Sequence, residues 1–324
     1  MYTEYFGPIN REELKGLESP CRKLQQGGLV AFPTETVYGL GAAILNVRAI
    51  KRLYQVKNRA EDHSLPVQIA NMDQLKFVAT DICHETRVLA KHFLPGPLTI
   101  ILKKNARLSP MITGGKSTVA VRFCSDPIAR RMIELTGCPL ATSSANISGK
   151  PSSTEASHVL EDFNGKIEGI VDGGTVEYGM ESTLISLEDR ACPTLLRFGM
   201  ISKQELENVL NRKLIVHPSA LNPSKGPVFD KLYPDVRLFS SWDEMGIYLK
   251  RSSMGKRMTM GTESSPLRQD HFCLNGNNLY EGLRIADRER YAEVLIHCSP
   301  AMKRNVLLFT KLKQVAAASS ISSA

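Results

Sequence analysis

The sequence predicts an α/β protein, with a mixed, twisted β-sheet that carries helices on its faces and a smaller C-terminal α/β domain. Apolar strand-like runs alternate with helical patterns through the first two thirds of the chain. Several of these runs follow one another too closely for uniform βαβ crossovers, which predicts a mixed sheet. The length of 324 residues also exceeds the roughly 250 to 300 residues at which single cores stop growing.

The predicted strands of the first sheet are short runs rich in Val, Ile, Leu, Thr and Phe, bounded by Gly, Pro, Asn or Ser. Such runs fit a half-buried or fully buried strand, because β-branched and aromatic side chains pack well on a pleated surface. In chain order, they are residues 29–32, 65–70, 98–102, 119–123, 167–171, 182–187 and 194–197.

Helices are predicted where apolar residues recur at helical spacing behind a capping residue. Residues 46–57 place their apolar side chains on one face, and residues 127–136 follow the N-cap candidate Asp126. Ser202 with Glu205 forms a capping box that opens the helix closing the first domain.

A proline-rich stretch divides the chain, because proline restrains itself and its predecessor to extended conformations. We therefore expect a first, larger domain over residues 1–212, a linker over 213–240 and a small α/β domain over 241–324. Within this small domain and its margins the patterns predict helices at 240–251, 278–288 and 305–318 and a strand at 292–297.

Charge and cysteine usage narrow the function class. The net charge of +8 falls mostly after residue 212, and it fits either RNA or polyphosphate ligands or an ordinary solvated surface. The seven cysteines never form a C-x-x-C pair, which argues against a disulfide framework or a zinc site. No signal peptide or membrane-spanning stretch is present, so we expect a cytoplasmic protein in a reducing compartment without membrane partners.

Residues 30–42, VAFPTETVYGLGA, place hydroxyl groups and bare backbone directly after an apolar strand. Ligands of open α/β sheets bind beyond the carboxyl ends of the strands, where loops choose the residues. The same segment also fits an ordinary strand followed by a turn, and the segment alone leaves both interpretations open.

Three cations stand at the ends of predicted elements. Lys57 and Arg59 end a helix, where they suit either one anionic ligand or a solvated end that complements the helix dipole. Arg122 ends a strand whose other face is apolar, so it fits either a bidentate carboxylate site or a salt bridge to Asp126.

Small hydroxyl side chains and an asparagine crowd between residues 142 and 153, after the apolar residues 139–141. Together with Gly149 they allow backbone N–H groups to converge on an anion, as phosphate and oxyanion sites require. A polar turn explains the serines and the glycine, but not so many of them before Pro151.

Taken together, these motifs resemble the threonylcarbamoyl-AMP synthase family, the longer branch of the YrdC-like proteins, densely over about residues 8–212. The resemblance rests on the order and spacing of these motifs together, because no single motif is specific enough to establish it. Besides residues 30–42, the matching segments are KNR at 57–59, PGPLT at 95–99, TVAVR at 118–122, SSANISGKP at 143–151, EST at 181–183 and LRFG at 196–199.

The resemblance implies synthesis of L-threonylcarbamoyl-AMP from L-threonine, bicarbonate or CO2, and ATP, with release of pyrophosphate, for modification of tRNA by a downstream transferase complex. It implies L-threonine contacts at Thr36, Gln68, Arg122, Thr142 and Ser182. It implies ATP contacts at Lys57, Arg59, His63, Thr118, Ser144, Asn146, Ser152, Arg197 and Tyr233. Phosphoryl transfer asks mainly for positioning and charge neutralisation, so no catalytic side chain is named and Mg2+ is expected to accompany ATP.

The sequence departs from the family pattern at four places. Asn58 replaces a usual Gly, His63 a usual Asn, Gln68 a usual His, and Leu232 the His of a linker motif that otherwise keeps Tyr233. His63 and Gln68 retain hydrogen-bonding capacity, so we expect retuned substrate affinity. The alternative hypothesis is a non-catalytic RNA-binding or assembly module of the same fold.

Overall fold

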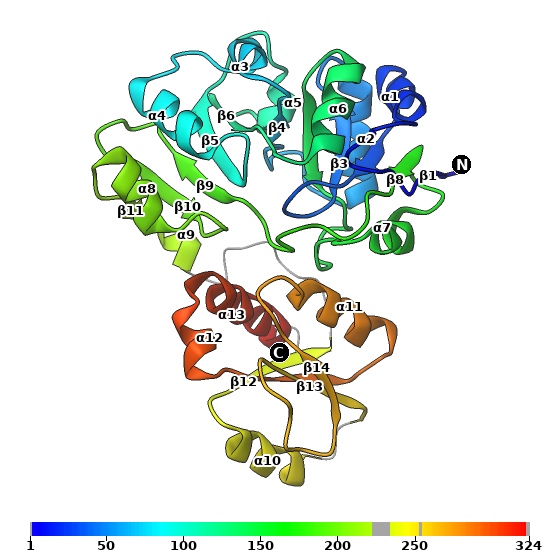
Figure 1. Ribbon diagram of the computed structural model, residues 1–324, viewed down its shortest axis with the longest axis vertical. Helices are drawn as coiled ribbons and strands as arrows, with labels where there is room; N and C mark the ends of the chain where they lie inside the picture. The colour runs from blue at the N-terminus through cyan, green and yellow to red at the C-terminus, as the bar shows by residue number, and fades with distance from the viewer. Residues whose placement is uncertain (1, 222–233, 253–254, 322–324) are drawn as a thin grey trace. The chain divides into compact units, whose positions relative to one another are not determined.

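The computed structural model describes residues 2–221, 234–252 and 255–321, which divide into two compact units (Figure 1). Unit 1 comprises Met1–Ile147 and Ser152–His217, and unit 2 comprises Ser148–Pro151 and Pro218–Ala324. None of the helices in these ranges is both long enough and apolar enough to cross a lipid bilayer.

Unit 1 is built on one eleven-stranded mixed sheet, in the order β1-β8-β2-β3-β7-β4-β6-β5-β9-β10-β11. Parallel pairs such as β4 with β6 stand beside antiparallel pairs such as β3 with β7, which confirms the predicted mixed sheet. The strands are β1 (Glu4–Phe6), β2 (Val30–Phe32), β3 (Gly39–Ala43), β4 (Val67–Gln68), β5 (Leu98–Lys103), β6 (Thr118–Arg122), β7 (Leu140–Ser144), β8 (Gly169–Val171), β9 (Thr183–Ser186), β10 (Thr194–Arg197) and β11 (Ile215–Val216).

Local signals place the helices of unit 1. Asn46 caps α2, Asp126 caps α6, and Ser202 with Glu205 forms the predicted capping box of α8. Asn58 ends α2 in the left-handed region at φ 55°, which Asn tolerates better than most residues. The helices are α1 (Glu18–Gln25), α2 (Val47–Lys57), α3 (Met72–Val78), α4 (His84–Phe93), α5 (Pro110–Thr113), α6 (Pro127–Thr136), α7 (Ala156–Phe163) and α8 (Lys203–Leu210).

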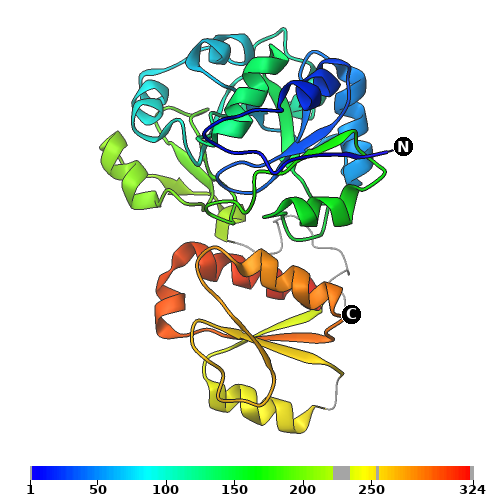
Figure 2. The same cartoon turned by 45° about the vertical axis from the view of Figure 1, so that its right-hand side comes forward.

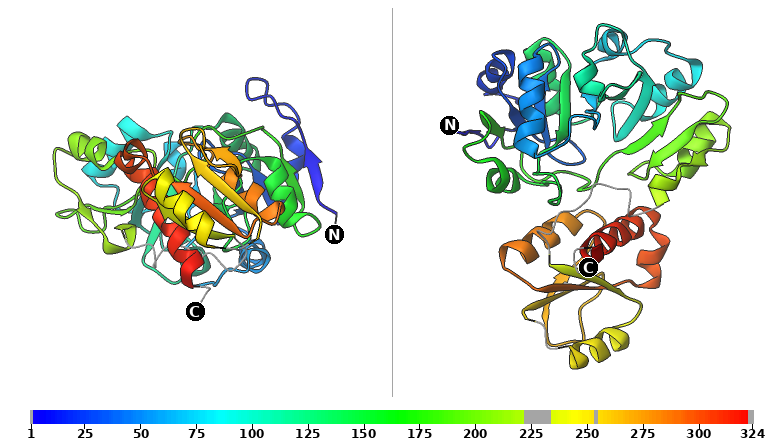
Figure 3. Two further views of the ribbon diagram at one scale, coloured as in Figure 1. Left: turned by 90° about the horizontal axis from the view of Figure 1, so that it is seen from below. Right: turned by 180° about the vertical axis from the view of Figure 1, so that it is seen from behind.

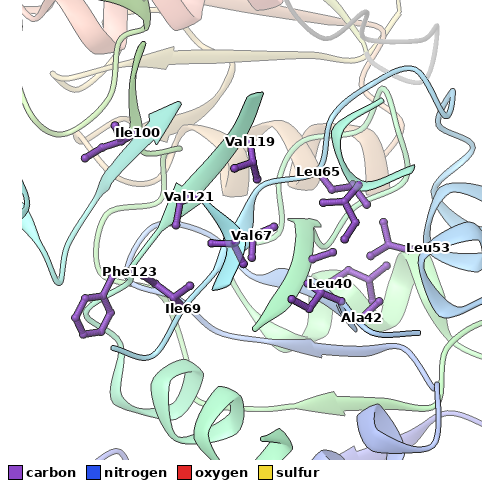
Figure 4. Packing of buried hydrophobic residues seen from close by; sticks show 14 of the residues in the cluster. Leu40, Ala42, Leu53, Leu65, Val67, Ile69, Ile100, Val119, Val121 and Phe123 are labelled. Carbon is purple, nitrogen blue, oxygen red and sulfur yellow. The ribbon is translucent and has the colours of Figure 1, made fainter. Parts of the chain in front are cut away.

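Buried apolar side chains form two clusters in unit 1. The larger cluster joins side chains of adjacent strands, such as Val67, Ile100 and Val121, to Leu53 of α2 (Figure 4). The second cluster joins Val30 of β2 to residues of α1 and α6. Gln68, Arg122 and Ser144, the last residues of β4, β6 and β7, belong to neither cluster, so these three strands end in polar residues that lead into loops.

Unit 2 is a small parallel α/β unit. Its strands β12 (Asp235–Phe239), β13 (Arg257–Gly261), β14 (Asp270–Cys273) and β15 (Glu293–His297) are ordered β12-β15-β13-β14. Helix α10 (Trp242–Arg251) covers one face, and α11 (Leu279–Arg288) and α13 (Val306–Ile321) cover the other, with α12 (Pro300–Arg304) before α13 (Figures 2 and 3). The smaller second α/β layer expected from the sequence is confirmed.

The range expected to be a linker, 213–240, carries secondary structure at both ends. Strand β11 pairs with β10 in unit 1, the short helix α9 (Pro218–Leu221) follows, and β12 belongs to the sheet of unit 2. Leu232 and Tyr233 lie outside the described residues.

Candidate functional site

Arg122 ends β6 and lies between two neighbouring strands. In the register of the sheet it stands beside Gln68 of β4 on one side and Thr99 of β5 on the other. Its Nη2 atom lies 2.8 Å from Oε1 of Glu35, and the two side chains are only 8% and 2% exposed. The predicted threonine contacts Arg122 and Gln68 are thus adjacent at the end of one strand pair.

The salt bridge between Arg122 and Asp126, which the sequence left open, is not what the structure shows. Asp126 accepts hydrogen bonds from the N–H groups of Ile128 and Ala129 at the start of α6, and its carboxylate pairs with Arg11 at 3.2 Å. The carboxylate beside Arg122 is that of Glu35 instead. Sequence reasoning missed this residue, although it stands between Thr34 and Thr36 in the segment that first suggested a ligand loop.

A hydroxyl-centred turn holds Thr36 in the loop after β2. The Thr34 hydroxyl accepts from the N–H groups of Thr36 and Val37 and donates to the Val37 carbonyl at 2.7 Å. It also lies 3.1 Å from the hydroxyl of Thr36, and both threonines are buried. The turn therefore fixes the conformation of the loop that carries both Thr36 and Glu35.

Ser182, a predicted threonine contact, is hydrogen-bonded to Arg197, a predicted ATP contact. Its hydroxyl lies 2.7 Å from that of Thr99, and it accepts from Nη2 of Arg197 at 3.0 Å. Nε of Arg197 donates to the Ser182 carbonyl at 2.9 Å. Thr99 is thereby a second residue that the sequence did not predict for the site, placed opposite Arg122 by the β5–β6 register.

Lys57 is buried rather than at a solvated helix end, so that alternative is wrong. Its ammonium donates to the carbonyl oxygens of Asn146 at 2.5 Å and of Ser144. Burial is the main cause that lowers the pKa of Lys57 to about 7, and the positive charge of the nearby Arg59 is the second cause. The side chain thus ties the end of α2 to the loop after β7.

Arg59 follows the left-handed Asn58 and is partly buried. Its Nη2 donates to the Ser64 carbonyl at 3.2 Å, and burial lowers its pKa from the ordinary value. Both predicted ATP contacts therefore donate to backbone carbonyls, Lys57 to those of Ser144 and Asn146 and Arg59 to that of Ser64. Nε of Arg59 is buried and makes no hydrogen bond among the described residues.

The hydroxyl-rich segment begins within β7, beside the bare backbone of β3. Thr142 stands opposite Gly41 and Ser144 opposite Gly39 in the antiparallel register. The Thr142 hydroxyl donates to the Pro66 carbonyl at 3.2 Å. The cluster predicted from the sequence therefore starts in the second half of β7, a central strand of the sheet, and continues into the loop after it.

Further along this segment, the Ser152 hydroxyl donates to Oε1 of Glu181 at 2.8 Å, and the Asn146 amide donates to the Ile147 carbonyl at 2.9 Å. Glu181 precedes Ser182, which stands directly before β9, so this hydrogen bond links the segment to the residues that lead into that strand.

Among the described residues, no hydrogen bond or ion pair joins Thr118 or His63 to Arg122. Thr118 lies on the same strand but at its opposite end, beside Lys103. His63 is 64% exposed and lies 3.2 Å from the carboxylate of Asp62, and Tyr233 is outside the described residues. Within the described ranges, no group of three or more His, Cys, Asp or Glu side chains is arranged to hold a metal ion.

The geometry gathers guanidinium, amide and hydroxyl groups at the ends of β4, β5 and β6, with further donors on the adjoining loops. Such donors can bind a carboxylate or a phosphate, but they offer no Ser/His/Asp arrangement for nucleophilic catalysis.

The chain is similar in sequence to known proteins. The Sua5/YciO/YrdC family model, described as "Telomere recombination", matches residues 22–199. A threonylcarbamoyl-AMP synthase of Pyrococcus abyssi is 49% identical over 201 residues, which is 62% of this chain and 58% of that protein. A threonylcarbamoyl-AMP synthase of Bacillus subtilis is 47% identical over 188 residues, 58% and 54% of the two chains. The sequence alignments thus span little more than half the length of these curated relatives.

Two solved structures are similar over nearly the whole chain. A double variant of P. abyssi Sua5 superposes with a TM-score of 0.87 at 34% identity, covering 98% of this chain and 97% of its own. The P. abyssi Sua5 complex with L-threonine gives a TM-score of 0.84 at 33% identity and covers 98% of both chains.

Proposed function

Because this chain belongs to the Sua5/YciO/YrdC family, we propose that it synthesises L-threonylcarbamoyl-AMP from L-threonine, bicarbonate or CO2, and ATP, and releases pyrophosphate. The observation that carries the proposal is the buried Arg122 between Gln68 and Thr99. A buried guanidinium beside amide and hydroxyl groups suits the carboxylate of an amino acid. The L-threonine complex of a relative with the same fold supports this choice of amino acid.

In the proposed site, Arg122 binds the threonine carboxylate, and Thr36, Gln68, Thr142 and Ser182 surround the amino acid. The nucleotide is assigned to Arg59, His63, Thr118, Ser144, Asn146, Ser152, Arg197 and Tyr233. Lys57 acts on the nucleotide through the carbonyl oxygens of Ser144 and Asn146, because its ammonium already donates to them.

The reaction follows from positioning. The threonine amine takes up CO2 or bicarbonate to give a carbamate, whose oxygen attacks the α-phosphate of ATP while pyrophosphate leaves. Such a step asks the protein to hold the reactants in line and to balance charge. The Ser182 contacts with Arg197 and Thr99 couple the two halves of the site. Mg2+ would enter with ATP and neutralise its phosphates.

We further propose a cytoplasmic enzyme that passes its product to a tRNA-modifying transferase complex. All seven cysteines are free thiols, as suits a reducing compartment. The names of the relatives favour the catalytic interpretation over the non-catalytic RNA-binding or assembly module.

The test is release of pyrophosphate from ATP with bicarbonate, in the presence and absence of labelled L-threonine. We expect release only with threonine, and its loss in Arg122→Ala. The matched control is Arg131→Ala, since Arg131 makes only an exposed pair with Glu134. Threonine-independent release, or salt-dependent RNA binding with no pyrophosphate, would refute the proposal.

A further inference from the structure

The Glu35–Arg122 pair is an unusual use of buried charge. Moving two charged groups out of water is costly, and a buried ion pair repays that cost only when further hydrogen bonds satisfy its polar atoms. Here Oε1 and Oε2 of Glu35 and Nε and Nη2 of Arg122 are buried without a hydrogen bond of acceptable geometry among the described residues. The pair is therefore poorly explained by stability alone.

The two Arg122 atoms left without hydrogen bonds, Nε and Nη2, lie on one side of the guanidinium. Nε and Nη2 form the edge that accepts a carboxylate through two parallel hydrogen bonds. Oε1 of Glu35 lies 2.8 Å from Nη2, within ion-pair distance, but its angle does not make a hydrogen bond. Glu35 thus balances the charge of Arg122 without using the hydrogen-bonding capacity of Nε and Nη2.

Independent contacts fix the backbone of Glu35. Its carbonyl accepts from the Tyr178 N–H at 2.9 Å, and the preceding Thr34 hydroxyl organises the turn that follows. The backbone that carries the Glu35 side chain is therefore held by contacts that do not involve Arg122.

From this geometry we propose that Glu35 is a positioning residue for amino-acid binding. It holds the Arg122 guanidinium by charge without taking up the hydrogen bonds of Nε and Nη2, so that these two donors remain available to the substrate carboxylate. The inference rests on the proposed function, because it takes Arg122 as the carboxylate ligand. A zwitterionic amino acid then enters without adding net charge to the buried pair.

The test compares three ligands in Glu35→Gln: L-threonine, 3-hydroxybutanoate, which lacks the amine, and L-threoninol, which lacks the carboxylate. We expect L-threonine and 3-hydroxybutanoate to bind at least about tenfold more weakly. L-threoninol binding, the KM for ATP and kcat at saturating threonine should stay within about twofold. Glu35→Asp, which keeps the charge, should recover part of the affinity.

Coupling to Arg122 gives an independent readout. In an Arg122→Lys background, Glu35→Gln should cause little further loss of threonine affinity, because the edge that it positions is gone. Additive losses in the two variants would overturn the proposal.

Two ligand patterns would also overturn it: an equal loss for all three ligands, and a loss confined to ligands with an amine, which would assign Glu35 to the ammonium instead. If thermal unfolding shows that Glu35→Gln does not fold, the same measurements are made on Glu35→Asp. A rise in the KM for ATP as well as in the KM for threonine in that variant would contradict the positioning role of Glu35. Failure of the wild-type protein to bind threonine would refute the proposed function itself, whereas threonine binding with an unselective loss refutes only the role of Glu35.

Discussion

The ammonium nitrogen of Lys57 lies 2.5 Å from the carbonyl oxygen of Asn146, which is 89 residues further along the chain. It also donates to the carbonyl of Ser144. These contacts join the last turn of α2 to the loop after β7 through a charge that has no access to water. The burial that makes the contact possible also penalises the charged form of the lysine.

This penalty predicts a pH dependence of stability. The pKa of Lys57 is lowered to about 7 in the fold from 10.5, so the unfolded chain binds more protons between these values. The free energy of unfolding should therefore rise with pH in this window, relative to Lys57→Met, by up to about 1.4 kcal/mol per pH unit. Urea unfolding of both proteins at pH 7, 8 and 9 measures the difference. Parallel curves would contradict the buried, penalised ammonium.

Two substitutions of Arg122 should affect threonine binding and the stability of the fold differently. Arg122→Lys keeps a cation beside Glu35 but loses the planar fork, so the KM for threonine should rise about tenfold or more while stability changes little. Arg122→Met leaves Glu35 buried and unpaired and should lower the free energy of unfolding by about 3 to 5 kcal/mol. Steady-state kinetics and urea unfolding check both, and unchanged threonine affinity in Arg122→Lys would remove Arg122 from the site.

Ser182 should couple the two substrates. Ser182→Ala removes the hydroxyl that meets both Thr99 and Arg197, so we expect weaker binding of threonine and of ATP. Thr99→Val is the matched control, because it removes one hydrogen bond at the same place, costs about 1 kcal/mol of stability and leaves the Arg197 contact intact. Calorimetric titration with threonine and with an ATP analogue compares the variants. Equal effects of the two substitutions on ATP would contradict the link through Arg197.

The buried ion network of unit 2 predicts a local stability effect. Glu293 is fully buried and contacts Arg257 at 2.7 Å, Arg237 at 3.1 Å and the hydroxyl of Tyr248. Glu293→Gln should lower the free energy of unfolding of unit 2 by about 3 to 5 kcal/mol, because it leaves buried guanidinium charge uncompensated.

The fluorescence of Trp242, the single tryptophan, follows the unfolding of this unit. Glu289→Gln is the control, since its exposed pair with Lys256 contributes about 0 to 1 kcal/mol. Similar losses in both variants would show that the buried network does not stabilise unit 2.

Local signals in the sequence predicted many features of the fold. The caps at Asp126 and Ser202 appear as predicted, because each cap is made by residues two or three positions apart. Strands 98–102 and 194–197 match β5 and β10 closely. Strand β3 was not predicted, since its glycine-rich sequence GLGAA carries little strand propensity and is held by pairing with β2 and β7.

For the candidate site, too, some features could be predicted from the sequence and others only from the tertiary structure. The sequence by itself determined the mixed α/β class, the second small domain and the residue types of an anion-binding site, because periodicity, caps and motif spacing are written along the chain. Only the tertiary structure decided that Glu35, and not Asp126, stands against Arg122, and that Lys57 supports the loop after β7. These contacts join residues 87 to 89 positions apart, and the pairing register of a many-stranded sheet, which no local pattern encodes, brings them together.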